Sequence, residues 1–162
     1  MAYYTKSLTH YERRLTRVVN IGTVPMGGSF PIRVQSMTTI DTMDTKGSLD
    51  QCIRMIKSGC DYIRITAPSI KQAKNLAEIK RSLREKGFHT PLIADIHFTP
   101  NAAEYAARIV EKVRINPGNY ADKKKFASID YTDNTYQAEL DRIRTKFSII
   151  KLEIRSSYAS AF

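Results

Sequence analysis

The chain has 162 residues, of which 42% are hydrophobic and 26% charged, and this composition excludes a disordered or collagen-like chain. The formal net charge is +10, which is compatible with nucleic acid, an anionic membrane surface or an anionic small molecule as a partner. A closed eight-stranded (β/α) barrel needs roughly 250 residues, so a complete barrel does not fit into this length.

The basic residues do not form the pattern of a nucleic-acid binder. The densest run is Lys123, Lys124 and Lys125, and so short a run is typical of a solvated loop. Single-strand binders interleave basic and aromatic residues along one stripe, and the sequence has no such stripe. We therefore expect no nucleic-acid partner.

Neither a membrane span nor a secretory leader is expected. No apolar run approaches the length of a bilayer span, and residues 1–17 lack a signal-peptide core. The two cysteines, Cys52 and Cys60, match no zinc, haem or redox spacing. We expect no membrane association, no bound metal and two reduced thiols in a cytoplasmic protein.

Short apolar strands alternate with amphipathic helices along the chain. Residues 16–31, which include Gly22, Gly27 and Gly28, predict a hairpin ahead of this pattern. A first core strand is expected over residues 32–37. The next helix is predicted to begin at Ser48, where Gln51 three residues later completes a capping box, and to end at Gly59.

The alternation then repeats three times. Strands are predicted over residues 62–66, 92–97 and 112–116. Ser69 with Gln72 predicts a second capping box, for a helix that is expected to end at Gly87. The buried stripe of that helix is expected to be Ile70, Ala73, Leu76, Ile79 and Leu83. Thr99 is expected to cap a helix with Pro100 at its first position. A last helix has four apolar residues on one side, namely Tyr136, Leu140, Ile143 and Phe147.

This order predicts an α/β fold with a parallel sheet. Right-handed crossovers place the helices on one side of the sheet when it curves into a barrel. Four βα units are therefore either the first half of a TIM (β/α) barrel or a small open sheet. We divide the chain into an N-terminal segment with the hairpin (1–31), the half barrel (32–147) and a tail (148–162).

Polar residues collect toward the carboxyl ends of the four predicted strands. Because side chains alternate between the two faces of a strand, one face gathers a shared set of polar groups. These are Gln35, Arg64, Thr66, Asp95, His97, Arg114 and Asn116.

This set suggests a site for a phosphorylated small molecule. Barrel enzymes place their active sites at the carboxyl ends of the strands, and arginine offers phosphate a planar pair of donors. Asp95 could orient His97 or the arginines. Taken singly, each residue is also compatible with a structural ion pair or acceptor, Gln35 is the weakest candidate, and Thr66 could simply pack. The repetition on four strands favours a binding site.

Four segments in this order resemble one enzyme family. They are PIRVQSMT (31–38), DYIRIT (61–66), ADIHFTPN (94–101) and KVRINPGN (112–119). Together they resemble the N-terminal barrel of the (E)-4-hydroxy-3-methylbut-2-enyl diphosphate synthase family, over roughly residues 16–147. The later segments YADKKKF (120–126), YTD (131–133) and YQAEL (136–140) resemble the long form of that family, which carries an extra middle domain.

The resemblance implies an activity. Family members convert 2-C-methyl-D-erythritol 2,4-cyclodiphosphate to (E)-4-hydroxy-3-methylbut-2-enyl diphosphate by reductive ring opening, in the non-mevalonate isoprenoid pathway. A four-iron four-sulfur cluster delivers the electrons, which ferredoxin or flavodoxin supplies. The barrel binds the diphosphate and a C-terminal domain brings the cluster.

By the same resemblance, Arg64, His97, Arg114 and Asn116 match family residues that line the substrate site, and Asp95 matches a position at or just behind it. Gln35 completes the predicted substrate-binding set. The cysteines here match no cluster-ligand position, so we expect no catalytic residue, no metal ligand and no bound cluster in this chain.

The resemblance stops abruptly near residue 148. The family continues into a fifth strand with the motif Arg-Ile-Gly-x-Asn-His-Gly, which is absent here, and we hypothesise a frameshift or premature stop. Such a half barrel is predicted to be inactive alone and to self-associate, because it leaves two open sheet edges.

Two alternative functions stay open at this stage. One is a half-barrel subunit of another enzyme for phosphorylated or pterin-like substrates, and the other is a non-enzymatic basic binding module.

Overall fold

The computed structural model describes residues 7, 9–10, 14–116, 120 and 130–159, with side chains as far as residue 148. The predicted loop run Lys123, Lys124 and Lys125 lies outside the described residues. In the part that is described, no helix is both long and apolar enough to cross a bilayer.

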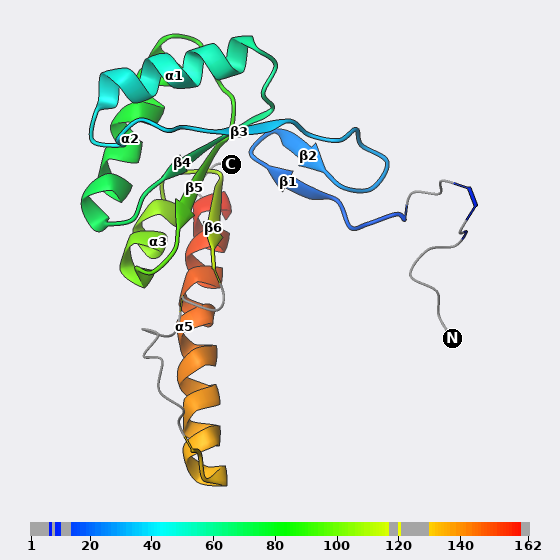
Figure 1. The fold of residues 1–162 in the computed structure, drawn as a ribbon, viewed down its shortest axis with the longest axis vertical. Coiled ribbons are helices and arrows are strands. Elements are labelled where there is room, and N and C mark those ends of the chain that lie inside the picture. The colour runs from blue at the N-terminus through cyan, green and yellow to red at the C-terminus, as the bar shows by residue number, and fades with distance from the viewer. Residues whose placement is uncertain (1–6, 8, 11–13, 117–119, 121–129, 160–162) are drawn as a thin grey trace.

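The predicted hairpin is confirmed. Strand β1 (Val19–Ile21) pairs antiparallel with β2 (Val24–Met26), and Ile21 lies opposite Val24. The two-residue connection begins with Gly22, whose φ of 58° is a conformation that glycine adopts without steric cost. The hairpin lies beside the start of the main sheet (Figure 1).

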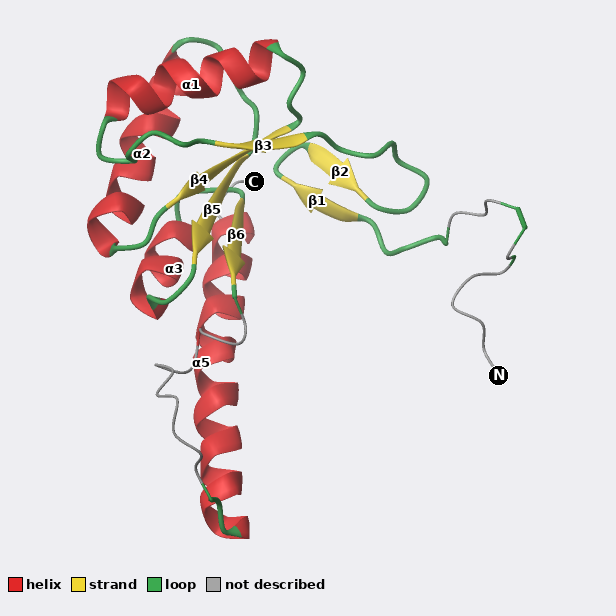
Figure 2. Cartoon of the chain, viewed as in Figure 1, coloured by secondary structure: helices red, strands yellow, loops and turns green. Residues whose placement is uncertain are grey.

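The main sheet consists of four parallel strands in chain order. They are β3 (Gln35–Met37), β4 (Tyr62–Thr66), β5 (Leu92–Ile96) and β6 (Lys112–Ile115). Sequential parallel order with a helix after each strand is the arrangement of a TIM barrel. The sheet is visibly curved, with the helices around its outer side (Figure 2).

In the described part of the chain, four helices accompany the sheet: α1 (Thr45–Lys57), α2 (Ile70–Glu85), α3 (Pro100–Ala107) and α5 (Asp133–Ala159). The main core lies between the helices and the outer face of the sheet. The strands contribute Ile63, Ile65 and Ala94 to it. Helix α2 contributes most of its predicted stripe, namely Ala73, Leu76, Ile79 and Leu83. Ile70, also predicted in that stripe, is exposed because it lies at the first position of the helix, outside this core.

Strand β3 is shorter than predicted. The expected strand began at residue 32, whereas the ladder begins at Gln35. The reason is a contact between segments far apart in the sequence: the Val34 amide donates to the Asp61 carboxylate at 2.8 Å, and Arg33 donates to the same residue at 3.4 Å. The side chain of Asp61 therefore occupies a backbone donor that a longer ladder would need.

The predicted start of α1 at Ser48 is wrong. The helix begins at Thr45, and Asp44 is the N-cap, with its carboxylate accepting a hydrogen bond from the Gly47 amide at 2.9 Å. Ser48 is buried inside the helix. Gln51 binds outside the helix instead, because its side-chain oxygen accepts from the Thr39 amide at 3.1 Å.

The other helix boundaries agree with the sequence in position. Ser69 and Thr99 are N-caps, with Pro100 first in α3, but neither cap side chain bonds to a backbone amide of its own helix. The Thr99 hydroxyl donates to the Pro68 carbonyl at 2.9 Å instead. Gly59 and Gly87 follow their helices with positive φ, as predicted for C-terminal stops.

Helix α5 approaches the sheet only along its later half. Phe147 packs against the main core and against the ring of Tyr120, with 5.1 Å between ring centroids. Leu140 and Ile143 are half-buried, whereas Tyr136 is exposed and contacts Tyr131. The first turns of α5 project away from the sheet (Figure 1), so the predicted apolar side is buried only in part.

Candidate functional site

The inner, concave face of the sheet is built in layers that the strand register fixes. At the amino ends, Gln35 lies opposite Tyr62. The next layer places Met37 beside Arg64 and Arg64 beside Ile93. A third layer, toward the carboxyl ends, joins Thr66, Asp95 and Arg114.

The amino end of this face is closed by the hairpin. Ile21, Tyr62 and Ile93 form a second small core with Val24 packed against it, and the Tyr62 hydroxyl donates to the Val24 carbonyl at 3.1 Å. Arg33 also contacts this hairpin, because its side chain donates a hydrogen bond to the Pro25 carbonyl at 2.8 Å. This apolar floor leaves the polar groups at the carboxyl end of the strands.

Asp95 is the centre of that polar group. Its side chain is only 2% exposed, and it accepts hydrogen bonds from Arg64 at 2.6 Å and from Arg114 at 3.1 Å. His97 Nε2 lies 3.2 Å from Oδ2, the carboxylate oxygen that also accepts from Arg64. Three neighbouring strands therefore converge on a single buried carboxylate.

The balance of charge keeps Asp95 ionised. Burial alone raises the pKa of Asp95, but hydrogen bonds from Arg64, His97 and Arg114 lower it more, so the pKa lies below its ordinary value. One carboxylate between two guanidinium groups leaves a surplus positive charge. Both guanidinium groups stay partly exposed to solvent, so an anion can reach this positive charge and neutralise it.

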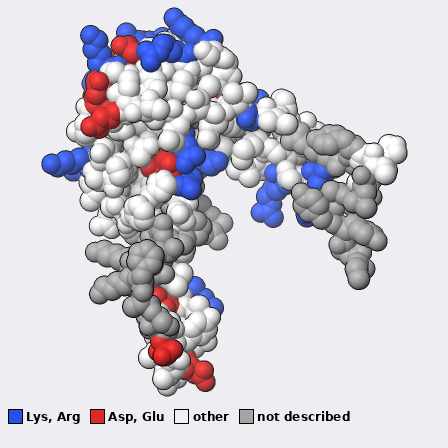
Figure 3. All heavy atoms as spheres, viewed as in Figure 1, with Lys and Arg blue, Asp and Glu red and all other residues white. Residues whose placement is uncertain are grey.

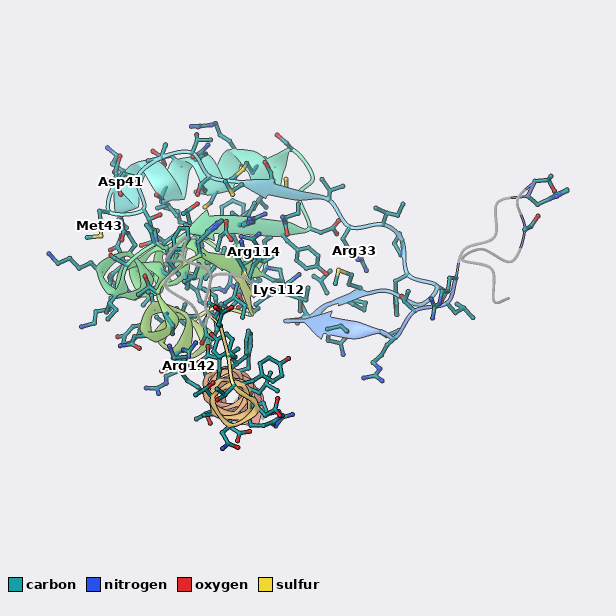
Figure 4. All side chains as sticks on the ribbon, turned by 60° about the horizontal axis from the view of Figure 1, so that its bottom comes forward. Arg33, Asp41, Met43, Lys112, Arg114 and Arg142 are labelled. Carbon is teal, nitrogen blue, oxygen red and sulfur yellow. The ribbon has the colours of Figure 1, made fainter. Side chains whose placement is uncertain are left out.

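Some hydrogen-bond donors of this polar group remain available to a ligand. The Arg64 Nε group is buried without a hydrogen-bond partner among the described residues. The guanidinium of Arg114 and the ring of His97 are more than a third exposed. Figure 4 shows Arg114 and Lys112 on β6 near the middle of the sheet, whereas Arg33 lies toward the hairpin.

The predicted residues separate into those that the structure brings together and one that it does not. Arg64, Asp95, His97 and Arg114 share direct contacts, and Thr66 lies level with Asp95. Asn116 follows β6 directly, is half-buried, and accepts a hydrogen bond at its carbonyl from the Tyr120 amide at 2.9 Å.

Gln35 is not brought to this group, and the prediction that it ends its strand is wrong. It begins β3, is exposed, and lies two layers below Asp95. The physical reason is the register: Gln35 pairs with Tyr62 at the amino end of β4, whereas β3 ends at Met37, where the predicted strand also ended. Alternation of side chains could have found Met37, and also Lys112 below Arg114, because both share the inner face with the predicted residues.

Lys and Arg atoms gather in separate groups on the face seen in Figure 3, over α1, over the middle of the sheet and on the hairpin side. Basic and acidic atoms meet over the middle of the sheet in that view. The site therefore has an apolar floor, a buried carboxylate and guanidinium donors that face outward. Such an arrangement can bind an anion such as a phosphate group.

Comparison with known proteins agrees with this geometry. A family model described as the GcpE TIM-barrel domain matches residues 16–145. A relative from Parabacteroides distasonis is 53% identical over 148 residues, which is 91% of this chain and 23% of that protein. A relative from Chlorobaculum tepidum is 50% identical over 153 residues, covering 94% of this chain and 20% of that protein.

A third relative, from Akkermansia muciniphila, is 49% identical over 152 residues, covering 94% of this chain and 26% of that protein. All three are named 4-hydroxy-3-methylbut-2-en-1-yl diphosphate synthase (flavodoxin). The chain spans about a quarter of the length of these curated relatives. With the family match over most of its residues, this chain belongs to the GcpE family, within the TIM-barrel domain.

Proposed function

We propose that this chain is the substrate-binding part of an isoprenoid-pathway synthase that acts on 2-C-methyl-D-erythritol 2,4-cyclodiphosphate and forms (E)-4-hydroxy-3-methylbut-2-enyl diphosphate. The observation that carries this proposal is the convergence of Arg64 and Arg114 on buried Asp95 at the carboxyl ends of the strands. The names of the relatives support the reaction, and the surplus positive charge supports a diphosphate ligand.

In this proposal the four strands are the first half of a barrel. Arg64 and Arg114 bind diphosphate oxygens, while Asp95 orients both guanidinium groups. His97 and Asn116 lie at the rim and contact the same ligand. The chain itself binds and orients the substrate and performs no redox step alone.

The iron–sulfur cluster that the family implies does not fit the described cysteines. Cluster iron is held by thiolates. Burial raises the pKa of the Cys52 thiol to about 12, despite a backbone hydrogen bond that lowers it, so its thiolate is disfavoured. Cys60 precedes β4, at the end of the sheet opposite Asp95. Within the described part of the chain, no three His, Cys, Asp or Glu side chains group closely enough for a metal ion.

The cluster and the flavodoxin or ferredoxin that reduces it therefore belong, in this proposal, to chemistry outside these residues. Two free thiols also suit a reducing compartment such as the cytoplasm. We expect the chain, incubated with iron and sulfide under reducing conditions, to retain no stoichiometric iron. Stoichiometric iron in the purified chain would contradict this assignment.

Calorimetric titration of the chain with the cyclic diphosphate tests the proposal. We expect weak but measurable binding, reduced roughly tenfold or more by Arg64→Gln or Arg114→Gln, because each change removes a charge-assisted hydrogen bond. Arg81→Gln is the matched control, since Arg81 lies on the exposed side of α2 and pairs with Glu78 and Glu85 of the same helix. Equal losses in all three variants would contradict a specific site.

A further inference from the structure

His97 Nε2 makes two contacts that cannot both be hydrogen bonds. It lies 3.1 Å from an Nη1 nitrogen of Arg114 and 3.2 Å from an oxygen of Asp95. A guanidinium only donates hydrogen bonds and an ionised carboxylate only accepts them. Because Nε2 carries either a hydrogen or a lone pair, it can satisfy one neighbour at a time.

Each neutral form of the ring leaves one repulsive contact. With a hydrogen on Nε2, His97 donates to Asp95 and faces the N–H of Arg114. With a lone pair there, His97 accepts from Arg114 and faces the carboxylate of Asp95. Arg114 Nη1 has another acceptor in the first case, since it also donates to Asp95 at 3.1 Å. The contact with Arg114 is therefore the one that a ligand can relieve.

An anion at this site would change which of the two contacts of His97 Nε2 is favoured. Its oxygens draw the exposed N–H groups of Arg114 outward, because charge-assisted bonds to phosphate or sulfate are stronger than a bond to a neutral ring. The anion also neutralises the surplus charge of Arg64 and Arg114 that opposes a third cation. The charged groups facing His97 are Asp95 on β5 and Arg114 on β6, with Arg64 on β4 reaching it through Asp95.

We infer that the site takes up one proton together with its anion. On binding, solvent supplies a proton to the ring, His97 becomes an imidazolium, its Nε2–H donates to Asp95, and Nδ1–H is left to face the ligand or water. This inference rests on the proposed function, because it requires that the arginines bind an anion. It makes His97 a positioning residue that couples anion affinity to pH.

Nitrogen NMR spectra of the histidine and arginine side chains of the 162-residue chain test this directly. Sulfate is the probe because its charge does not change in the pH range where histidine titrates. We expect saturating sulfate at neutral pH to convert His97 from a neutral ring pattern to the imidazolium pattern. His10 and His89 are exposed and serve as internal controls that do not respond. Sulfate affinity should rise as pH falls from about 8 to about 6, by at most about tenfold per pH unit for one linked proton.

Two variants separate the linkage from the anion site. His97→Asn is expected to bind sulfate with no pH dependence over this range, and Asp95→Asn to remove the imidazolium pattern in the presence of sulfate. Sulfate that shifts arginine signals but leaves His97 neutral would overturn the linkage and leave the anion site standing. If sulfate shifts no arginine signal at all, both the anion site and the linkage are overturned.

Discussion

Asp95 organises the site because side chains from β4, from the end of β5 and from β6 all contact its carboxylate. Arg64 comes from β4, Arg114 from β6 and His97 from the end of β5, and all three lie within hydrogen-bond distance of its two oxygens. A buried carboxylate that holds two arginines fixes their direction before any ligand arrives. This preorganisation reduces the conformational cost of binding an anion.

Stability should depend on pH through Asp95. Its pKa lies below the ordinary value near 3.9, so the ionised form stabilises the fold above about pH 4 and that stability is lost as pH falls through the lowered pKa. Asp95→Asn should lower the free energy of unfolding by about 1–3 kcal/mol at neutral pH and shrink the difference between pH 7 and pH 3. Urea denaturation at both pH values measures this, with exposed Asp50→Asn as control. An unchanged pH difference in Asp95→Asn would contradict it.

Two buried tyrosines should respond oppositely to loss of the hydroxyl. The Tyr120 hydroxyl is buried without a partner among the described residues, and burial raises the pKa of Tyr120 to about 12. Tyr120→Phe should leave stability unchanged or raise it by up to about 1 kcal/mol, because no bond is lost. Tyr62→Phe should cost about 0.5–1.5 kcal/mol, because its hydroxyl donates to Val24. Thermal unfolding of both variants checks this, and a larger loss in Tyr120→Phe would refute it.

Among the elements, the helices differ in how their first turns are held. Asp44 caps α1 through the Gly47 amide, and a Cβ at Gly47 would lie 2.4 Å from the Asp44 carboxylate. The small residue at position 47 therefore allows the close approach of the cap. Helix α2 has Ser69 at the same position, but the Ser69 side chain accepts no hydrogen bond from a backbone amide of the first turn.

This difference predicts unequal costs for removing the two cap side chains. Asp44→Ala should destabilise the protein by about 0.5–2 kcal/mol, the usual cost of losing an N-cap bond. Ser69→Ala should cost clearly less, because its hydroxyl bonds to Gln72 Oε1 rather than to a backbone amide. Chemical denaturation of both variants under one condition gives the comparison. Equal losses of stability in Asp44→Ala and Ser69→Ala would contradict the expected difference between the two caps.

At the scale of the whole molecule, the sheet has an open strand on each side among the described residues. Strands β3 and β6 each have one neighbour there, and open parallel edges favour pairing with another chain. The segment leading into β3 also exposes large apolar side chains, with Ile32 82% and Val34 54% exposed. The tertiary structure thus offers an edge that is both unpaired and apolar.

We therefore predict that the isolated chain self-associates through the β3 side. Ile32→Lys and Val34→Lys should lower the self-associated fraction, because a charge opposes edge pairing. Val18→Lys, on the exposed part of the hairpin, is the matched control and should change it less. Sedimentation velocity over a range of concentrations measures the fraction. A wild-type chain that stays monomeric throughout would contradict the prediction.

Local chemistry in the sequence was sufficient for much of the fold. Alternation of short apolar strands with 3.6-residue periodicity predicted β4, α2 and the parallel order, and Gly59 and Gly87 marked helix ends, because these features depend on neighbours close in sequence. The same alternation placed Arg64, Asp95, His97 and Arg114 on one face.

Only the tertiary structure decided the start of β3, because the Asp61 side chain binds the Val34 amide from 27 residues away in the sequence. The cap of α1 is local, since Asp44 binds the Gly47 amide three residues later. The register of β3 with β4 places Gln35 two layers below Asp95. The structure alone also made Asp95 the shared acceptor, since the sequence fixes which face a side chain takes but not which neighbouring strand it reaches. The rule of two-residue alternation is local, whereas the choice among hydrogen-bond partners depends on strand register and on the distances between strands.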